Sequence, residues 1–258
     1  MMNFTKITAQ GNDYLYFDYL EKTAPEIDMV EFAKTYSNRY FGVGSDGIVW
    51  MLPSEKADLR MRIWNADGTE AEMCGSALRS VVMIYGQKYS KKEVSVETNS
   101  GIKSGEITDF SNKIVEVNMG EVDFLNYAET IAIQLKTGYQ VEVGNPHFVI
   151  FDEDDINKFG KLIGENPFFV NGTNVELVKV VSKNEIDIKI WERGSGATLA
   201  CGTGATASAA IAMKKYRLND QVKVNMPGGS VYVKFKKDEN NYYLSGGVSF
   251  ICEGKLFV

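Results

Sequence analysis

Two cysteines, Cys74 and Cys201, stand in similar surroundings in the two halves of the sequence. Each follows a polar, Gly-bearing stretch, is itself followed by Gly, and leads into a run of small or apolar residues, as in EAEMCGSALRS and GATLACGTGATA. These runs predict a helix directly after each cysteine. A thiol at a helix N-terminus faces free backbone N–H groups and the positive end of the helix dipole. Both favour the thiolate, so we expect thiol pKa values lowered toward neutrality.

Two such cysteines could flank one small ligand and work on a single carbon atom. One thiolate would remove a proton from one face of the carbon, and the other residue, as a thiol, would return a proton to the opposite face. This is two-base inversion of a stereocentre, which needs an acid and a base near the working pH. Gly75, Gly202 and Gly204 would let backbone N–H groups approach a substrate carboxylate and stabilise the carbanion-like charge that develops.

Internal repeats explain how two halves could present the two thiols. Cys201 follows Cys74 by 127 positions, and two further pairs of segments, SVETNSGIKSGEI with KVNMPGGSVYVKF and VEVNMGEV with YLSGGVSF, are offset by 128. GNDYLYFD and GNPHFVIFD are offset by 133, and VGSDGIV matches NGTNVEL more weakly. We therefore predict two similar domains, 1–120 and 121–258, joined near residues 120–127, with the tail from about 248 to 258 packing back on the first. A pseudo-twofold arrangement would make a shared cleft between them.

The elements that must position the thiols are mostly strands. Runs rich in β-branched and aromatic residues predict strands at LYFDYL, IVWML, LRMRIW, EVSVET, KIVEVNM, HFVIFD, ELVKVV, IDIKIW and SVYVKF. Asp28 and Glu31 form a capping box that predicts a helix over 29–39. The helix after Cys74 is amphipathic, whereas the one after Cys201 is apolar on most sides and is expected to be buried. These elements predict a mixed α+β fold.

Composition excludes several classes of function. The chain has 258 residues, 28 basic and 34 acidic, with a net charge of -6, so no basic surface for nucleic acid is expected. No apolar run is long enough to span a membrane, and the N-terminus lacks the pattern of a secretory signal. A single His and three Cys without zinc-ribbon spacing argue against a metal site. We expect a cytoplasmic protein whose thiols stay reduced, with Cys252 in a structural role.

One Gly-rich motif is rejected as a cofactor site. The segment 202–207, GTGATA, has the form GxGxxA found in dinucleotide-binding proteins. In dinucleotide-binding proteins the glycines directly follow a buried strand. In this chain the segment ERGSGATLAC separates the motif from the predicted strand that ends at Trp191. No cofactor is therefore predicted.

Taken together, these segments resemble the diaminopimelate epimerase family of cofactor-independent amino-acid racemases. NADGTEAEMCG and ERGSGATLACGTGA are similar to the family's two active-site signatures. GND at 11–13, GNPH at 144–147, TNVE at 173–176 and the closing VSFICEG are similar to family landmarks in the same order, over essentially the whole chain. The resemblance implies two pseudosymmetric domains, each a β-barrel-like sheet around a central helix, with the site between them and without pyridoxal phosphate or metal.

The resemblance also implies roles for individual residues. Cys74 and Cys201 are the catalytic pair, and His147 and Glu192 assist the thiols. The residues predicted to bind substrate are Asn12, Asn65, Gly75, Ser76, Asn145, Asn174, Glu192, Arg193, Gly202 and Thr203. A distal carboxylate suits an Arg fork and Asn amides, and a distal ammonium suits Glu192. The predicted reaction is epimerisation of LL-2,6-diaminopimelate to the meso form, which feeds lysine and peptidoglycan synthesis.

Departures from the family pattern leave the substrate open. The family has Gly-Asn-Gly after the first cysteine, where this chain has Gly75-Ser76-Ala77, and Gly-Glu-Thr in the second signature, where it has Gly196-Ala197-Thr198. One alternative is a related racemase acting on histidine or a lanthionine-like amino acid. Another is a non-catalytic amino-acid-binding protein, against which the intact cysteine pair argues. The resemblance further implies a homodimer, and two close cysteines could form a regulatory disulfide.

Overall fold

The computed structural model describes residues 1–125, 131–133, 136–152 and 154–257. The chain forms two compact units, one made of residues 1–117 and 246–258 and the other of residues 118–245. The chain passes from one unit to the other within two strands, Ile114–Gly120 and Asn241–Gly247. Part of the predicted join, residues 126 and 127, lies outside the described residues.

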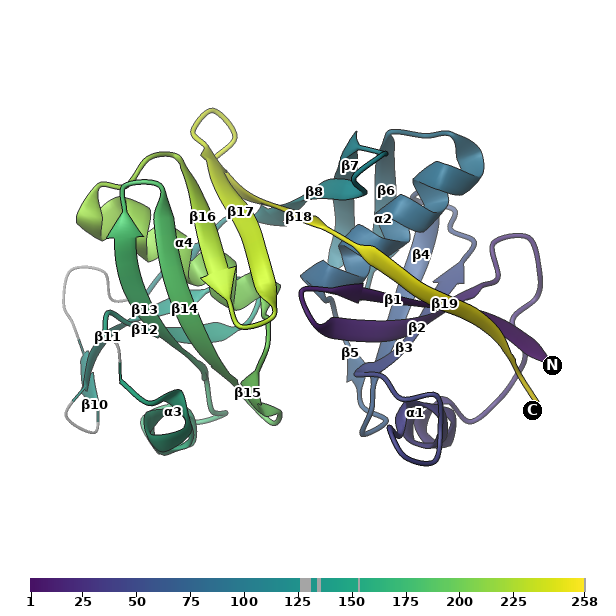
Figure 1. Ribbon diagram of the computed structural model, residues 1–258, viewed down its shortest axis with the longest axis horizontal. Coiled ribbons are helices and arrows are strands. Elements are labelled where there is room, and N and C mark those ends of the chain that lie inside the picture. The colour runs from purple at the N-terminus through teal and green to yellow at the C-terminus, as the bar shows by residue number, and fades with distance from the viewer. Residues whose placement is uncertain (126–130, 134–135, 153, 258) are drawn as a thin grey trace. The chain divides into compact units, whose positions relative to one another are not determined.

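The first unit contains a sheet that encloses one long helix (Figure 1). Its sheet runs in the order β19-β1-β2-β3-β4-β6-β7-β8, with the short β5 paired to β4. The bounds are β1 (Met2–Ala9), β2 (Asn12–Asp18), β3 (Gly47–Leu52), β4 (Leu59–Asn65), β5 (Glu70–Ala71), β6 (Glu93–Thr98), β7 (Gly101–Asp109), β8 (Ile114–Gly120) and β19 (Ser249–Leu256).

The second unit repeats this plan. Its sheet runs β11-β12-β13-β14-β16-β17-β18, with β15 paired to β14 and both β9 and β10 paired to β11. The bounds are β9 (Asp123–Phe124), β10 (Ile131–Ile133), β11 (Lys136–Glu142), β12 (Pro146–Ile150), β13 (Asn174–Ser182), β14 (Glu185–Glu192), β15 (Gly196–Thr198), β16 (Gln221–Met226), β17 (Gly229–Lys236) and β18 (Asn241–Gly247).

The strand directions show that the two units are structural repeats. From β1 to β8, neighbouring strands pair antiparallel, parallel, antiparallel, parallel, antiparallel and antiparallel. From β11 to β18 the same senses occur in the same order. The repeats in the sequence therefore correspond to equivalent strands, and the predicted α+β class is confirmed.

Each unit places its cysteine at the start of its long helix. Helix α2 (Gly75–Tyr89) has Cys74 as N-cap, and α4 (Gly202–Tyr216) has Cys201 as N-cap, both with extended backbone. Both helices end at a residue in the left-handed conformation, Ser90 and Arg217. Helix α2 packs on β1, β2, β6 and β7, and α4 packs on β11 to β14, β16 and β17. Residues 204–212 of α4 are all buried, as the apolar pattern predicts.

A short helix covers the outside of each sheet. Asp28 caps α1 (Met29–Ser37) by accepting hydrogen bonds from the N–H groups of Val30 and Glu31, so the predicted start is confirmed. The helix ends two residues before the predicted end, where Asn38 turns extended. Helix α3 (Ile156–Gly164), capped by Asp155, was not predicted. Aromatic clusters fill the layers beneath these helices, with Phe17 and Trp50 under α1 and Phe148 and Phe169 under α3.

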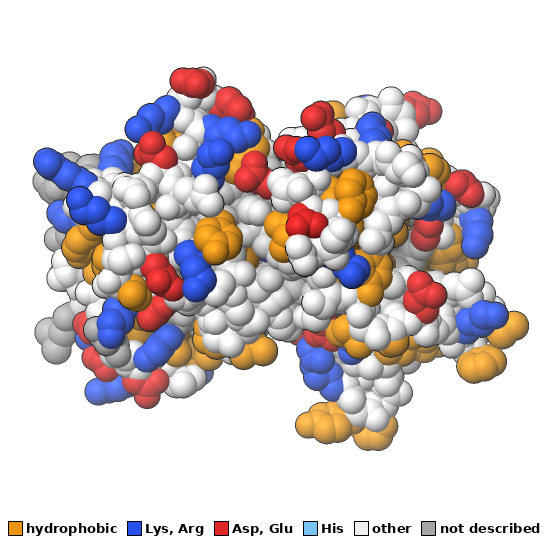
Figure 2. Space-filling model, turned by 45° about the horizontal axis from the view of Figure 1, so that its top comes forward, with side chains coloured by type: hydrophobic (Ala, Val, Ile, Leu, Met, Phe, Trp, Pro, Cys, Tyr) orange, Lys and Arg blue, Asp and Glu red, His pale blue; other side chains and the backbone are white. Residues whose placement is uncertain are grey.

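Charged side chains of both signs are interspersed on the face shown in Figure 2 rather than separated by sign. In the described part of the chain, no helix is long and apolar enough to cross a membrane.

Candidate active site

Cys74 lies among polar groups from the β1–β2 hairpin. Its Sγ atom accepts a hydrogen bond from the Tyr14 hydroxyl at 3.7 Å and donates one to Asn12 Oδ1 at 3.5 Å. Tyr14 is buried, and this burial, with the neighbouring Cys74, raises the pKa of its hydroxyl well above the ordinary value. The hydroxyl is therefore a neutral donor beside the thiol at neutral pH.

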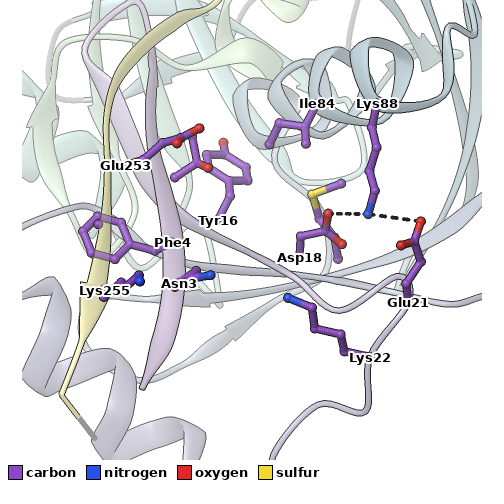
Figure 3. Close-up of a pocket in the computed structure, with 13 residues that line it drawn as sticks. Asn3, Phe4, Tyr16, Asp18, Glu21, Lys22, Ile84, Lys88, Glu253 and Lys255 are labelled. Atoms are coloured by element: carbon purple, nitrogen blue, oxygen red, sulfur yellow. Dashed lines mark hydrogen bonds and ion pairs between the residues drawn. The ribbon is translucent and has the colours of Figure 1, made fainter.

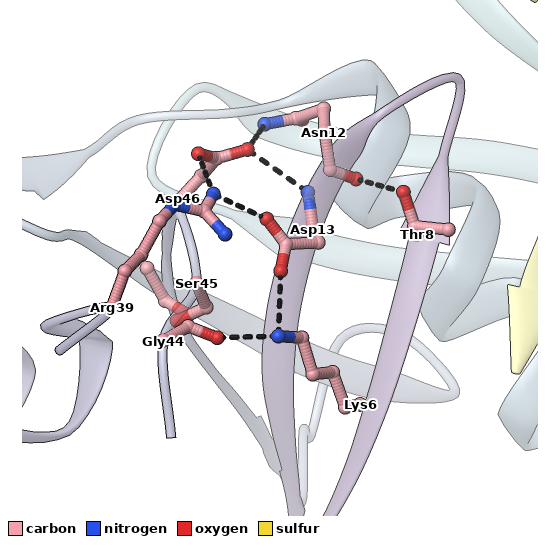
Figure 4. A network of polar contacts seen from close by, with 9 residues as sticks. Lys6, Thr8, Asn12, Asp13, Arg39, Gly44, Ser45 and Asp46 are labelled. Carbon is pink, nitrogen blue, oxygen red and sulfur yellow. Dashed lines mark hydrogen bonds and ion pairs between the residues drawn. The ribbon is translucent and has the colours of Figure 1, made fainter. Parts of the chain in front are cut away.

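A network behind Asn12 decides which end of its amide faces Cys74 (Figure 4). Asp46 Oδ2 accepts from Asn12 Nδ2 at 2.8 Å and from the Asp13 N–H at 2.9 Å. Arg39 donates to Asp13 at 2.7 Å and to Asp46 at 2.8 Å, and Lys6 pairs with Asp13 at 3.0 Å. Because a carboxylate can only accept, Asp46 holds the NH2 group of Asn12 and turns its carbonyl oxygen toward the thiol.

The other predicted residues of the first unit lie at the same sheet end or in the helix. Strand register puts Tyr14 beside Gly47 and Gly47 beside Asn65, the last residue of β4. Gly47 is required there, because a Cβ atom would lie 2.2 Å from the Trp64 carbonyl oxygen. Gly75 and Ser76 are buried in the first turn of α2, where the N–H groups precede the first hydrogen bond of the helix, from Leu78 to Cys74.

Cys201 lies in a different setting, among carboxylates. Its Sγ accepts from the Gly204 N–H at 3.4 Å and lies 3.3 Å from Thr203 Oγ1. Glu192, the last residue of β14, is close enough to interact electrostatically with Cys201. Burial raises the pKa of Cys201 well above its ordinary value, and the charges of Glu192 and Glu176 raise it further. The expected lowering of this pKa is therefore wrong, because burial and two carboxylates outweigh the helix dipole.

His147 and Glu176 form a fully buried pair, and the Glu176 charge acts on Cys201. His147 Nδ1 lies 2.7 Å from Glu176 Oε1, and its Nε2 lies 2.9 Å from Asn145 Oδ1. Neither His147 nor Glu176 is exposed to solvent. Both ring nitrogens face oxygen atoms, so the ring is held from two sides. Glu176 Oε2 is buried without a hydrogen-bond partner, so the carboxylate is oriented by His147.

Asn174 and Arg193 hold the neighbouring turn. Asn174 is buried, donates to the Pro146 carbonyl at 2.9 Å and accepts from the Arg193 N–H at 2.9 Å. The Arg193 side chain is exposed, donates to the Asn171 carbonyl at 3.0 Å and lines a cavity of about 560 Å³ together with Trp191. Asn174 thus shapes the backbone, whereas the Arg193 guanidinium is available to a ligand.

A second cavity, of about 570 Å³, is lined by none of the predicted site residues (Figure 3). Lys88 spans it to Asp18 at 2.8 Å and to Glu21 at 3.5 Å. Its charged groups thus compensate one another. Nowhere in the described ranges do three or more His, Cys, Asp or Glu side chains gather as metal ligands would.

The sequence interpretation missed several groups around the two thiols. Tyr14, Asp46 and Arg39 lie outside the predicted site set. Glu176 belongs to the quoted TNVE segment, yet it was not assigned a role. An acidic residue inside a buried strand run, Val175-Glu176-Leu177, is the signal that could have identified it.

Comparison with known proteins identifies the family. A family model described as "Diaminopimelate epimerase" matches residues 4–125 and 139–251. The chain belongs to this family. The diaminopimelate epimerase of Carboxydothermus hydrogenoformans is 38% identical, with 100% of each chain covered. The diaminopimelate epimerase of Methanococcus maripaludis is 35% identical, with 99% of each chain covered.

Solved structures share the fold at low sequence identity. A PhzF-family phenazine biosynthesis protein of Bacillus anthracis aligns with a TM-score of 0.73 at 16% identity, covering 100% of this chain and 99% of that one. A hydroxyproline epimerase of Agrobacterium vitis, solved with bound trans-4-hydroxy-L-proline, aligns with a TM-score of 0.70 at 13% identity, covering 98% and 91%. The diaminopimelate epimerase fold of this chain thus extends beyond its close relatives.

Proposed function

We propose that this member of the diaminopimelate epimerase family converts LL-2,6-diaminopimelate to the meso isomer without a cofactor, through Cys74 and Cys201. The observation that carries the proposal is the placement of both cysteines as N-caps of equivalent helices, each within reach of polar partners. Relatives that cover the whole chain and are named diaminopimelate epimerase support the choice of substrate.

The proposed reaction moves one proton off the substrate and another onto it. A thiolate takes the proton from the substrate Cα, and the electron pair left on carbon is delocalised into the adjacent carboxylate. The second thiol then donates its proton to the opposite face and becomes a thiolate. The substrate carboxylate would bind N–H groups in the first turns of the two helices, including those of Gly202 and Thr203, which stabilise the additional negative charge.

The raised pKa of Cys201 supports its assignment as the proton donor in the resting protein. Burial also raises the pKa of Glu192, the carboxylate that interacts electrostatically with that thiol. A carboxylate of higher pKa is a stronger base, so Glu192 would take the proton of Cys201 when the reaction runs in the other direction. His147, paired with Glu176, would assist the two thiols.

The distal end of the substrate would be held by the polar set of the second unit. Arg193 is exposed beside a cavity and suits a distal carboxylate, and Asn145 would contribute its amide. Asn12 and Asn65 would contribute amides from the first unit. Ser76, Ala77 and Ala197 differ from the family pattern and are the positions at which substrate choice would depart from diaminopimelate.

Incubation with LL-diaminopimelate in deuterated water tests the proposal. Loss of the Cα proton signal together with formation of the meso isomer supports it. Exchange with L-histidine or lanthionine but not with diaminopimelate would overturn the substrate assignment. No exchange with any amino acid in fully reduced protein would leave only a binding role. Cys74→Ser and Cys201→Ser should each lower turnover by a factor of roughly 100 or more.

We also propose a cytoplasmic homodimer that binds no nucleic acid. Cys74, Cys201 and Cys252 are not joined in disulfides, which suits a reducing compartment. Strand β19 pairs with β1 and leaves Phe250 and Ile251 exposed at 37% and 53%, which suits an interface with a second copy. Light scattering tests this: Ile251→Lys should yield monomers, whereas Val181→Lys, an exposed apolar residue of the other unit, should not. An unchanged mass for Ile251→Lys would exclude this surface.

A further inference from the structure

Arg79 is the largest side chain that is fully buried, at 1% exposure. It is the fifth residue of α2, one turn beyond Cys74. Its Nε donates to the Gly75 carbonyl at 3.4 Å and its Nη2 donates to Gln10 Oε1 at 2.7 Å, while Nη1 is buried without a hydrogen-bond partner. A buried guanidinium that leaves one donor unused is costly unless a charge compensates for it.

Gln10 supplies a neutral partner, not a counter-charge. Its Nε2 donates to the Gly247 carbonyl at 3.0 Å, so its oxygen must face Arg79. Among residues 1–125, 131–133, 136–152 and 154–257, no carboxylate lies within ion-pair distance of Arg79. The nearby carboxylate on β2, Asp13, is already engaged by Lys6 and Arg39.

Three titratable groups remain to be considered, and two of them, Tyr16 and Cys74, interact electrostatically with the guanidinium. Tyr14 and Tyr16 on β2 are buried, and burial raises the pKa of each hydroxyl, so neither provides a negative charge at neutral pH. Cys74 is the third. Burial lowers the pKa of Arg79 to about 10, and interaction with Cys74 and Tyr16 opposes that lowering. Arg79 is therefore still a cation at neutral pH, and Cys74 is the group able to become its anion.

The equivalent positions of the second unit differ in charge from those of the first. The fifth residue of α4 is the neutral Thr206, whose Oγ1 donates to the Gly202 carbonyl at 2.9 Å, as Arg79 donates to Gly75. Val49, the third residue of β3, corresponds to Glu176, the third residue of β13. Asn65, the last residue of β4, corresponds to Glu192, the last residue of β14. At these three positions the first unit thus has a cation and no carboxylate, whereas the second has two carboxylates, one of them paired with His147.

We propose that Arg79 is the buried counter-charge of the Cys74 thiolate, so that the two repeats hold their thiols in opposite protonation states at rest, Cys74 as the base and Cys201 as the acid. Arg79 acts through Cys74 and is a positioning residue. The Asn12 oxygen, which accepts from the Cys74 thiol, opposes Arg79 and keeps the thiol form accessible for the reverse reaction. This inference rests on the proposed roles of the two thiols.

The pH dependence of alkylation tests the proposal. Iodoacetamide reacts with thiolates, and mass spectrometry of the peptides reports Cys74 and Cys201 separately in one sample. Arg79→Met should raise the midpoint for Cys74 by about one pH unit, a tenfold slower reaction near neutrality, and leave Cys201 unchanged. Arg79→Lys, which keeps the charge, should recover most of the difference. An unchanged Cys74 midpoint in Arg79→Met overturns the proposal.

A second pair of variants covers the case in which Arg79→Met fails to fold. Gln10→Glu keeps the side-chain shape and gives Arg79 a closer anion, so it should raise the Cys74 midpoint. Gln10→Met loses both hydrogen bonds of the Gln10 side chain without adding a charge. It should leave the Cys74 midpoint near that of the parent. Equal midpoints in these two variants contradict the proposal. Alkylation needs no substrate, so failure to epimerise diaminopimelate would overturn the proposed function without deciding this result.

Discussion

His147 Nδ1 lies 2.7 Å from Glu176 Oε1, and neither side chain is exposed to solvent. The contact joins β12 to β13, which run parallel. The Glu176 charge also contributes to the raised pKa of Cys201. One carboxylate therefore acts on two groups of the candidate site, orienting the imidazole and keeping the thiol protonated.

Glu176→Gln should separate these two effects from mere packing. The amide keeps the shape but removes the charge, so the alkylation midpoint of Cys201 should fall while that of Cys74 stays constant. Turnover should drop roughly tenfold, because the His147 ring loses its charged partner. Glu142→Gln, at an exposed position of β11, is the control and should match the parent. A Cys201 midpoint that does not move would show that Glu176 has no electrostatic role.

Local signals in the sequence were sufficient to predict the helices that carry the thiols. The run after each cysteine and the offset of 127 residues placed both helix starts correctly. Strands rich in β-branched residues, such as β3 and β14, were also predicted. Strands such as β7 and β18, with glycines and polar residues, were not, because they are stabilised by pairing with the strands beside them rather than by local propensity.

The acidity of the thiols could not be predicted in the same way. The helix N-terminus is a local feature, and it predicted a lowered pKa for both cysteines. The groups that raise the pKa of Cys201 come from β13 and β14, whose positions depend on the whole sheet. The partner of His147 could not be predicted either, because His147 and Glu176 are 29 residues apart along the chain.

Glu192→Gln should abolish proton exchange between the Cys201 thiol and the side chain at position 192. We expect turnover to fall by a factor of roughly 100, because an amide cannot act as a base. The Cys201 alkylation midpoint should also fall, because a neighbouring negative charge is removed. Glu185→Gln, at the other end of the same strand, should retain parent turnover. Parent-like turnover in Glu192→Gln would exclude this carboxylate from the reaction.

The pH–rate profile offers a separate check on Glu192. Burial raises the pKa of this carboxyl, so it becomes protonated and stops acting as a base at a higher pH than an ordinary Glu, for which the pKa is about 4.3. The acid limb of the parent profile should therefore lie above that value, and it should disappear in Glu192→Gln. A limb that persists unchanged in the variant would have to arise from another group.

Gly204→Ala should destabilise the second unit despite the higher helix propensity of Ala. A Cβ atom at position 204 would lie 2.6 Å from Glu176 Oε1, a fully buried atom held by His147. We expect a loss of about 1–3 kcal/mol in the free energy of unfolding, measured with urea. In a Glu176→Ala background the same substitution should cost less, because its neighbour is gone. Equal costs in the two backgrounds would mean that the two positions do not interact.

Asp46→Asn tests how Cys74 is balanced between its two protonation states. In the parent, Asp46 holds Asn12 Nδ2 at 2.8 Å, which leaves the Asn12 oxygen to accept from the thiol at 3.5 Å. An amide at position 46 can accept or donate, so Asn12 becomes free to turn its NH2 group toward sulfur. A donor stabilises the thiolate, and a nearby negative charge is also lost, so the alkylation midpoint of Cys74 should fall. Asp109→Asn, in an exposed turn of the same unit, should leave it unchanged. A midpoint that rises in Asp46→Asn would mean that the network supports the thiolate through Arg39 rather than the thiol through Asn12.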